Sequence, residues 1–196
     1  MAIKDSQTPI TYGHSMRVVL GFIKASHPLP TIAVSLVISA FAWSLGWTGL
    51  SLVAVFATIL VGQLSVGWSN DAHDANLDAR IGRSTKPTVT QDVSARALWL
   101  AALTALLIAI ASSWAVAGWL GGSFHIFAIL MAWLYNIRLS RTAWSWLPYS
   151  LAFGAMPAVR LKPYARNLIS EIQPDLAKAS TRRCRSRQVQ RVSGGR

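Results

Sequence analysis

Four uncharged apolar stretches dominate this sequence, and each is long enough to cross a lipid bilayer as a helix. They cover residues 29–47, 48–69, 97–117 and 119–137, and none of them contains Asp, Glu, Lys or Arg. A spanning helix needs about 20 such residues to cross a hydrocarbon core of about 30 Å. A fifth stretch, residues 142–159, is slightly short. The pattern predicts an all-α, polytopic transmembrane bundle of four to five spans.

The composition favours an integral membrane protein over a soluble or nucleic-acid-binding one. Hydrophobic residues fill 53% of the 196 positions, and charged residues fill only 13%. The net charge of +12 is unevenly placed, because residues 160–196 hold ten Lys/Arg against two acidic residues. This basic segment has a single aromatic residue, Tyr164, whereas single-stranded nucleic acids are bound by several stacking aromatics. We therefore expect a lipid bilayer as a partner and no nucleic acid.

The charges between the spans predict how the chain is oriented. Uncharged connectors at 46–49 and 118–122 alternate with basic ones at 80–96 and 138–141. Cytoplasmic connectors carry an excess of Lys and Arg, so the N-terminal segment and both basic connectors are expected in the cytoplasm. The expected location is the plasma membrane of a prokaryote.

Charge and hydropathy divide the chain into three parts. These are a cytoplasmic N-terminal segment (1–28), a transmembrane domain (29–159) and a basic, irregular tail (160–196). A fifth span leaving the cytoplasm would deliver the basic tail to the outside, which the positive-inside bias opposes. The tail is therefore interpreted either as out-of-frame, aberrant sequence or as a genuine disordered segment attracted to anionic lipid.

Three of the seven carboxylates lie together directly after the second span. If that span continues as a helix past Ser69, the spacings of three and four place Asp71, Asp74 and Asp78 on one face. Like charges at these spacings repel, so the cluster requires a compensating positive charge. A divalent cation or nearby basic residues would supply it.

The residues around this cluster favour binding of a phosphate group. Carboxylates, together with the amide of Asn70, are hard oxygen ligands that suit Mg²⁺, and Mg²⁺ commonly bridges protein carboxylates to substrate phosphates. Arg80, Arg83 and Lys86 follow and can contact phosphate oxygens. The alternative is a solvated acidic helix end that is simply paired with the basic residues beyond it.

The string Asn70-Asp71-x-x-Asp74-x-x-x-Asp78, with Lys86-Pro87 downstream, resembles the first aspartate-rich motif of the UbiA superfamily of intramembrane prenyltransferases. The family pattern is NDxxDxxxD, followed by a basic residue and an Arg-Pro or Lys-Pro pair. Residues 26–30 (SHPLP) resemble its entry segment, and residues 134–141 (LYNIRLSR) resemble the end of its fourth helix. The resemblance covers roughly residues 14–158.

The resemblance implies a nine-helix bundle around a central cavity, of which this chain holds four to five spans. It implies two aspartate-rich motifs that hold Mg²⁺ and a prenyl diphosphate, and transfer of the isoprenyl group to a hydrophobic or aromatic acceptor. The metal residues carried over are Asp71, Asp74, Asp78 and Asn70; no separate catalytic residue is assigned.

The remaining residues carried over are diphosphate contacts and cavity residues. Arg80, Arg83 and Lys86 are the expected diphosphate contacts, and Tyr135 and Gln63 are candidate cavity residues. A polar residue within the fourth span, His125, is interpreted as a contact between helices and receives no further role.

The second aspartate-rich motif and the later spans of the family pattern do not occur in these 196 residues. We therefore expect a truncated prenyltransferase homologue with feeble activity. One alternative is a non-catalytic membrane remnant that binds a lipid diphosphate. The other is a CDP-alcohol-type phosphotransferase, whose DxxDGxxAR motif this sequence breaks at Ala75 and at the displaced Arg80.

Overall fold

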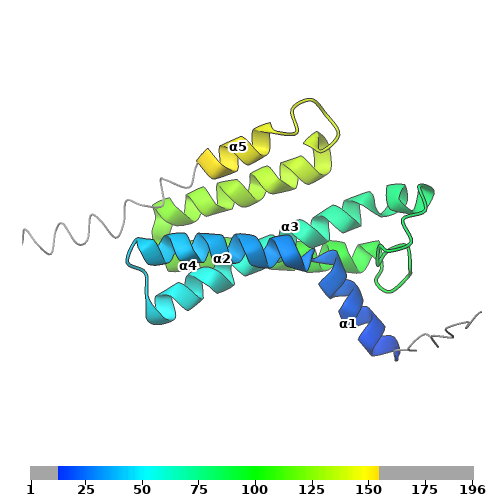
Figure 1. Ribbon diagram of the computed structural model, residues 1–196, viewed down its shortest axis with the longest axis horizontal. Coiled ribbons are helices and arrows are strands. Elements are labelled where there is room, and N and C mark those ends of the chain that lie inside the picture. The colour runs from blue at the N-terminus through cyan, green and yellow to red at the C-terminus, as the bar shows by residue number, and fades with distance from the viewer. Residues whose placement is uncertain (1–12, 155–196) are drawn as a thin grey trace, which may run out of the picture.

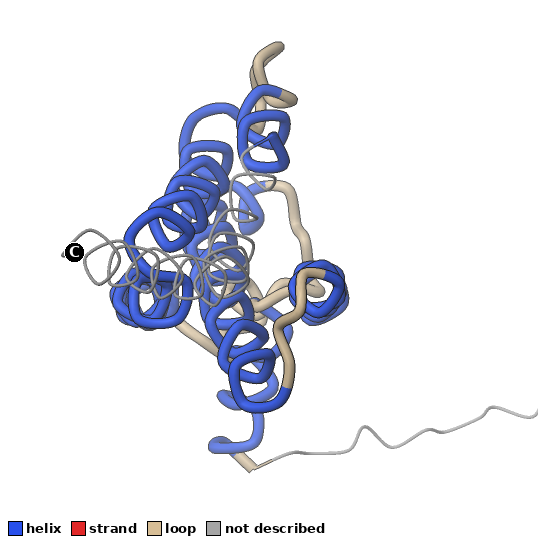
Figure 2. Tube along the Cα trace, turned by 90° about the vertical axis from the view of Figure 1, so that its left-hand side faces the viewer, coloured by secondary structure: helices blue, strands red, loops and turns tan. Residues whose placement is uncertain are grey.

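A computed structural model describes residues 13–154, and the chain within this range is helical and contains no strand (Figure 1). The all-α prediction is confirmed. The elements are α1 (His14–Ala25), α2 (Pro28–Ser44), α3 (Gly49–Arg80), α4 (Ala95–Leu134), the π-helical turn η1 (Tyr135–Leu139) and α5 (Leu147–Gly154). Figure 2 looks along the bundle, so that most of the helices are seen roughly end-on.

The first two predicted spans correspond to α2 and α3. Prolines stand in the first turn of α2, where the missing N–H costs nothing. α3 is 32 residues long, which at 1.5 Å per residue gives about 48 Å. This length exceeds the bilayer core, so the last turns of α3, with the aspartate cluster, extend beyond its apolar part. The expectation that the second span continues as a helix past Ser69 is confirmed.

The third and fourth predicted spans are the two arms of α4, which reverses direction at Gly118. The backbone angles of Gly118, φ 68° and ψ −176°, belong to a region essentially restricted to glycine. Beyond it the helix returns along itself, so that the rings of Trp99 and Trp133 lie 6.0 Å apart between centroids. Closer to the reversal, Ser113 Oγ and His125 Nδ1 are 2.7 Å apart.

The length and apolarity of the helices agree with an integral membrane protein. Within the described range, α3 and the continuous segment Ala95–Leu139 are each long and apolar enough to cross a membrane. α1 and α2 would together count as a third crossing, with a bend of 54° between them. Of the predicted fifth span, residues 142–146 form a bend and turns and residues 147–154 form α5, whereas residues 155–159 and the basic tail lie outside the described residues.

The bend between α1 and α2 is packed tightly against α3. A methyl group added at Gly67 would lie only 2.7 Å from the carbonyl oxygen of Ser26, so the absence of a side chain permits the contact. Beside this contact, Trp68 Nε1 donates a hydrogen bond of 2.9 Å to the carbonyl of Phe22. These contacts bring the start of α2 beside the aspartate end of α3.

Candidate functional site at the end of α3

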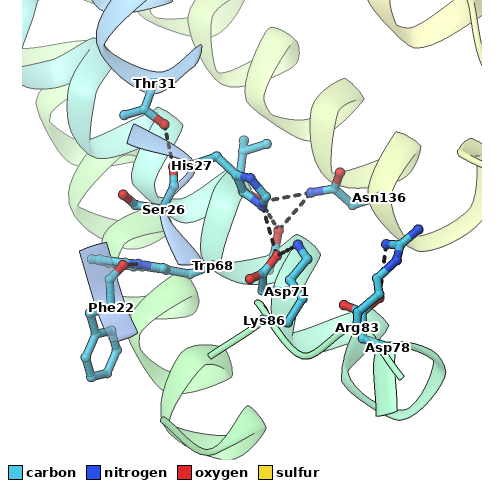
Figure 3. A network of polar contacts seen from close by, with 12 residues as sticks. Phe22, Ser26, His27, Thr31, Trp68, Asp71, Asp78, Arg83, Lys86 and Asn136 are labelled. Carbon is cyan, nitrogen blue, oxygen red and sulfur yellow. Dashed lines mark hydrogen bonds and ion pairs between the residues drawn. The ribbon is translucent and has the colours of Figure 1, made fainter. Parts of the chain in front are cut away.

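Asp71 is the buried centre of the site, and its side chain is 1% exposed. Its Oδ1 accepts hydrogen bonds from Lys86 Nζ at 2.6 Å and from His27 Nε2 at 2.9 Å (Figure 3). Nε2 is the donor because an ionised carboxylate only accepts. The second oxygen, Oδ2, is buried without a hydrogen-bond partner among the described residues. Oδ1 of Asp71 therefore accepts two hydrogen bonds, whereas Oδ2 accepts none from the described residues.

The other two aspartates are paired with different bases. Asp78, whose side chain is 0% exposed, accepts a bond of 3.1 Å from Arg83 Nη1, and its own Oδ2 is again buried without a partner in the described chain. Asp74 is less buried and accepts a bond of 2.6 Å from Arg141 Nη2. The compensating positive charge that the cluster requires is thus supplied by a separate base at each aspartate.

His27 reaches Asp71 from the junction of α1 and α2. Its φ of 51° lies in the left-handed region, which costs an L-residue about 1–2 kcal/mol. A strained backbone conformation persists only where the surrounding contacts hold it in place, and such residues are common at functional sites. Here the left-handed turn joins the two helices and holds the imidazole at the carboxylate.

Lys86 is positioned by a compact segment between α3 and α4. The carbonyl of Pro87 accepts hydrogen bonds from the backbone N–H groups of Asp92 at 3.0 Å and of Val93 at 3.3 Å. The Asp92 carboxylate also accepts a bond of 3.0 Å from Arg17 Nε on α1. The pKa of Asp92 lies below its ordinary value, first because the Thr90 hydroxyl donates to it and further because of Arg17.

Asn136 in η1, directly after the second arm of α4, forms hydrogen bonds to α3 next to Asp71 (Figure 3). Its Nδ2 donates to the carbonyl of Val66 at 2.9 Å and to Ser69 Oγ at 3.2 Å. The residue lies in η1, and π-helical turns are rare and frequently found at functional sites. The π-helical turn therefore places a buried amide at the polar end of the bundle.

A cavity of about 540 Å³ runs between the helices from this polar end. His27, Asn70 and Asn136 line it beside Asp71, and much of the remaining lining is apolar. Two predicted cavity residues, Gln63 and Tyr135, do line it. The cavity has the character expected for a lipid-like molecule with a polar head.

The arrangement fits Mg²⁺ at individual aspartates better than at the cluster as a whole. No group of three or more His, Cys, Asp or Glu within residues 13–154 lies close enough to hold one metal ion. Asp71 and Asp78 are two turns apart on α3, about 10 Å along the axis, whereas ligand oxygens of one Mg²⁺ lie about 2.1 Å from it. The unpartnered Oδ2 atoms are nevertheless hard ligands that Mg²⁺ accepts.

The predicted metal and diphosphate residues thus share one end of the molecule, and their roles stay predictions. Asp71, Asp78, Arg83 and Lys86 are joined by the two ion pairs described above. Arg80 is exposed at the last residue of α3. These same ion pairs are also what the alternative interpretation, an acidic helix end paired with basic residues, would produce.

Sequence reasoning missed three residues of this site: His27, Arg141 and Asn136. His27 lies 44 positions from Asp71, and Arg141 lies 67 positions from Asp74. Two signals were available: the need for compensating charge, and the resemblance of residues 26–30 and 134–141 to family segments that contain these three residues. Neither signal says which group on α3 each residue would contact.

Paired aspartates and bases at the head of a largely apolar cavity, between helices that can cross a membrane, define a polytopic membrane protein with a charged site at one end of its bundle. Residues 28–161, more than half of the chain, match the model of the UbiA prenyltransferase family. The chain therefore belongs to this family. The match removes the basis for the CDP-alcohol-type alternative.

Among curated proteins, the chain is similar to the protoheme IX farnesyltransferases of two strains of Thermus thermophilus. Each is 32% identical over 117 residues, which cover 57% of this chain and 19% of the relative. The chain thus spans about a fifth of the length of the curated relatives it matches. No solved structure matches it.

Proposed function

We propose that this chain binds a prenyl diphosphate at the aspartate end of α3 and takes part in transferring its isoprenyl group to a hydrophobic or aromatic acceptor. The observation that carries the proposal is the pair of buried carboxylates, Asp71 and Asp78, each with one oxygen bound to a base and one without a protein partner among the described residues. A buried acceptor of this kind is costly unless something occupies it. A cation and a phosphate group would satisfy both the acid and the base.

The chain's own residues would bind the two ends of the donor differently. Lys86 and Arg83, which reach the aspartates from the segment after α3, can turn their donors to phosphate oxygens. Asp71 and Asp78 would hold Mg²⁺, which supplies charge neutralisation of the leaving diphosphate when bound. The apolar cavity would receive the isoprenyl chain and exclude water from the allylic carbon as its bond to oxygen breaks.

The names of the relatives supply the first reagents to test. Farnesyl diphosphate is the first donor to examine, because both relatives are farnesyltransferases, and protoheme IX is the first acceptor. We further propose that the aspartate end of α3 faces the cytoplasm of a prokaryote, because the basic residues cluster there. Accessibility of Ser84→Cys, combined with Cys184→Ser, to a membrane-impermeant reagent in intact cells and in inverted vesicles tests this orientation.

The decisive experiment is Mg²⁺-dependent binding of farnesyl thiodiphosphate, an analogue that ionises slowly, to the full chain in lipid nanodiscs. We expect saturable binding that requires Mg²⁺ and that weakens at least about tenfold in Asp71→Asn, the scale of effect seen when metal sites are perturbed. Thr104→Val is the control: it alters an exposed residue of α4 whose hydroxyl bonds only to the backbone of its own helix, and it should leave binding unchanged.

Binding that ignores both Mg²⁺ and Asp71→Asn would refute the proposed site. Binding without any transfer to protoheme IX or to an aromatic acceptor would favour the alternative, a lipid-diphosphate binder without catalysis. Product formation that is lost in Asp71→Asn would support the enzyme.

A further inference from the structure

A second polar group lies far from the aspartates, between the two arms of α4. Ser113 on the first arm is buried, and its Oγ lies 2.7 Å from Nδ1 of His125 on the second arm. The contact joins the two arms, as expected for a polar residue between helices. Both residues also line the cavity.

The hydrogen bonds of Ser113 fix which nitrogen of His125 carries the proton. The Ser113 hydroxyl donates its single hydrogen to the carbonyl of Ala109, because a carbonyl oxygen can only accept. Ser113 Oγ must therefore accept from His125, so Nδ1 carries the hydrogen. In a neutral imidazole, this leaves Nε2 as a bare acceptor. Nε2 has no hydrogen-bond partner among residues 13–154.

The bare nitrogen faces α3 well inside the bundle. A methyl group added at Gly62 would lie 3.4 Å from His125 Nε2. Gly62 precedes Asp71 by nine residues on α3, which is about 13 Å along the helix axis. The next residue, Gln63, lines the same cavity. An amide and a bare imidazole nitrogen thus line an otherwise largely apolar space at the depth of the membrane spans.

We propose that His125 and Gln63 form a subsite that recognises a hydroxyl group on a lipid-soluble molecule in the cavity. The hydroxyl would donate to His125 Nε2, and its oxygen would accept from the amide of Gln63. Polar side chains within membrane spans are costly and mark ligand paths when they face a cavity. The inference goes beyond the proposed function, because it assigns a polar subsite of the cavity without assigning which reactant occupies it.

The test compares 4-octylphenol with its methyl ether, 4-octylanisole, in which a methyl group replaces the hydroxyl hydrogen and removes the donor. Binding to the full chain in nanodiscs is followed by tryptophan fluorescence, with empty nanodiscs correcting for partition into lipid. We expect the phenol to bind about three- to tenfold more tightly, the value of one net hydrogen bond. His125→Phe should remove this preference, so that the variant binds the two probes equally. The matched control, His73→Phe, changes an exposed histidine of α3 and should retain the preference.

Equal binding of the two probes by the unaltered chain would overturn the proposal and leave the polar pair to solvent water. A preference that persists in His125→Phe would overturn it as well. Ser113→Ala provides a milder variant, since it frees the ring to change tautomer and should reduce the preference. These results are separate from the diphosphate assay, so a phenol preference without farnesyl thiodiphosphate binding would sustain the subsite and refute the proposed function.

Discussion

Replacing Lys86 with methionine tests whether Asp71 is held as a buried ion pair. Nζ of Lys86 lies 2.6 Å from the carboxylate, and the two side chains are 18% and 1% exposed. Removing one partner of a buried pair costs about 3–5 kcal/mol, because the other charge is left in a medium that solvates it poorly. His27 retains a hydrogen bond to the same oxygen, so we expect the lower end of that range, about 3 kcal/mol.

The matched control is Arg141→Met at the exposed pair with Asp74. Their N–O distance is also 2.6 Å, but the side chains are 56% and 20% exposed. Such pairs contribute about 0–1 kcal/mol, since water already solvates both charges. The free energy of unfolding of both variants would be measured in mixed micelles with increasing denaturant and tryptophan fluorescence as the signal. Because the N–O distance is the same in both ion pairs, the comparison tests the effect of burial alone.

A double variant separates the buried charge from other effects of the substitution. In Lys86→Met with Asp71→Asn, a neutral amide replaces the orphaned carboxylate, so we expect most of the lost stability to return. Indistinguishable losses in Lys86→Met and Arg141→Met would refute the reasoning. A double variant as unstable as Lys86→Met alone would refute it too, because the cost would then not arise from the unpaired charge of Asp71.

Three further predictions concern contacts around the site, each measured by unfolding. Gly67→Ala should destabilise the fold by about 1–3 kcal/mol, because its methyl group would meet the backbone oxygen of Ser26 at 2.7 Å; a neutral effect would contradict the close packing. Asn136→Leu should cost about 1–3 kcal/mol by removing two hydrogen bonds to α3, each worth about 0.5–1.5 kcal/mol, and an unchanged midpoint would show that water replaces the amide. The pKa of Asp92 lies below its ordinary value of 3.8, so its stabilising effect is present above that value and is lost as the pH falls through the folded-state pKa. Asp92→Asn should therefore reduce the acid sensitivity of unfolding, and identical pH profiles would contradict the lowered pKa of Asp92.

The helices were predictable because the membrane imposes a simple rule on composition. Uncharged runs of about 20 residues located α2, the apolar part of α3 and both arms of α4, and the glycines at 118–122 located the reversal. The short α1 could not be found in the same way. It is too short to span, and its position depends on the contact between Ser26 and Gly67.

The site was predictable as a cluster but not as a set of contacts. The motif spacing located Asp71, Asp74 and Asp78 on one helix end, where the structure also has them. The base that pairs with each aspartate depends on which distant segments of the chain pack against the end of α3. The family-like segments 26–30 and 134–141 contain His27 and Arg141, but their contacts with the aspartates depend on a left-handed turn and on the return of the chain after α4, which are tertiary features.

The reversal at Gly118 also bears on how the protein enters a membrane. The two arms of α4 are joined by a single residue outside helical geometry and by a connector without charges. No polar loop therefore has to be carried across the bilayer when this pair inserts, and charged residues are the costliest to translocate. The arms can enter together as one hairpin, with the Ser113 and His125 contact formed during insertion rather than after it. A single glycine thus links the route of assembly to the shape of the cavity.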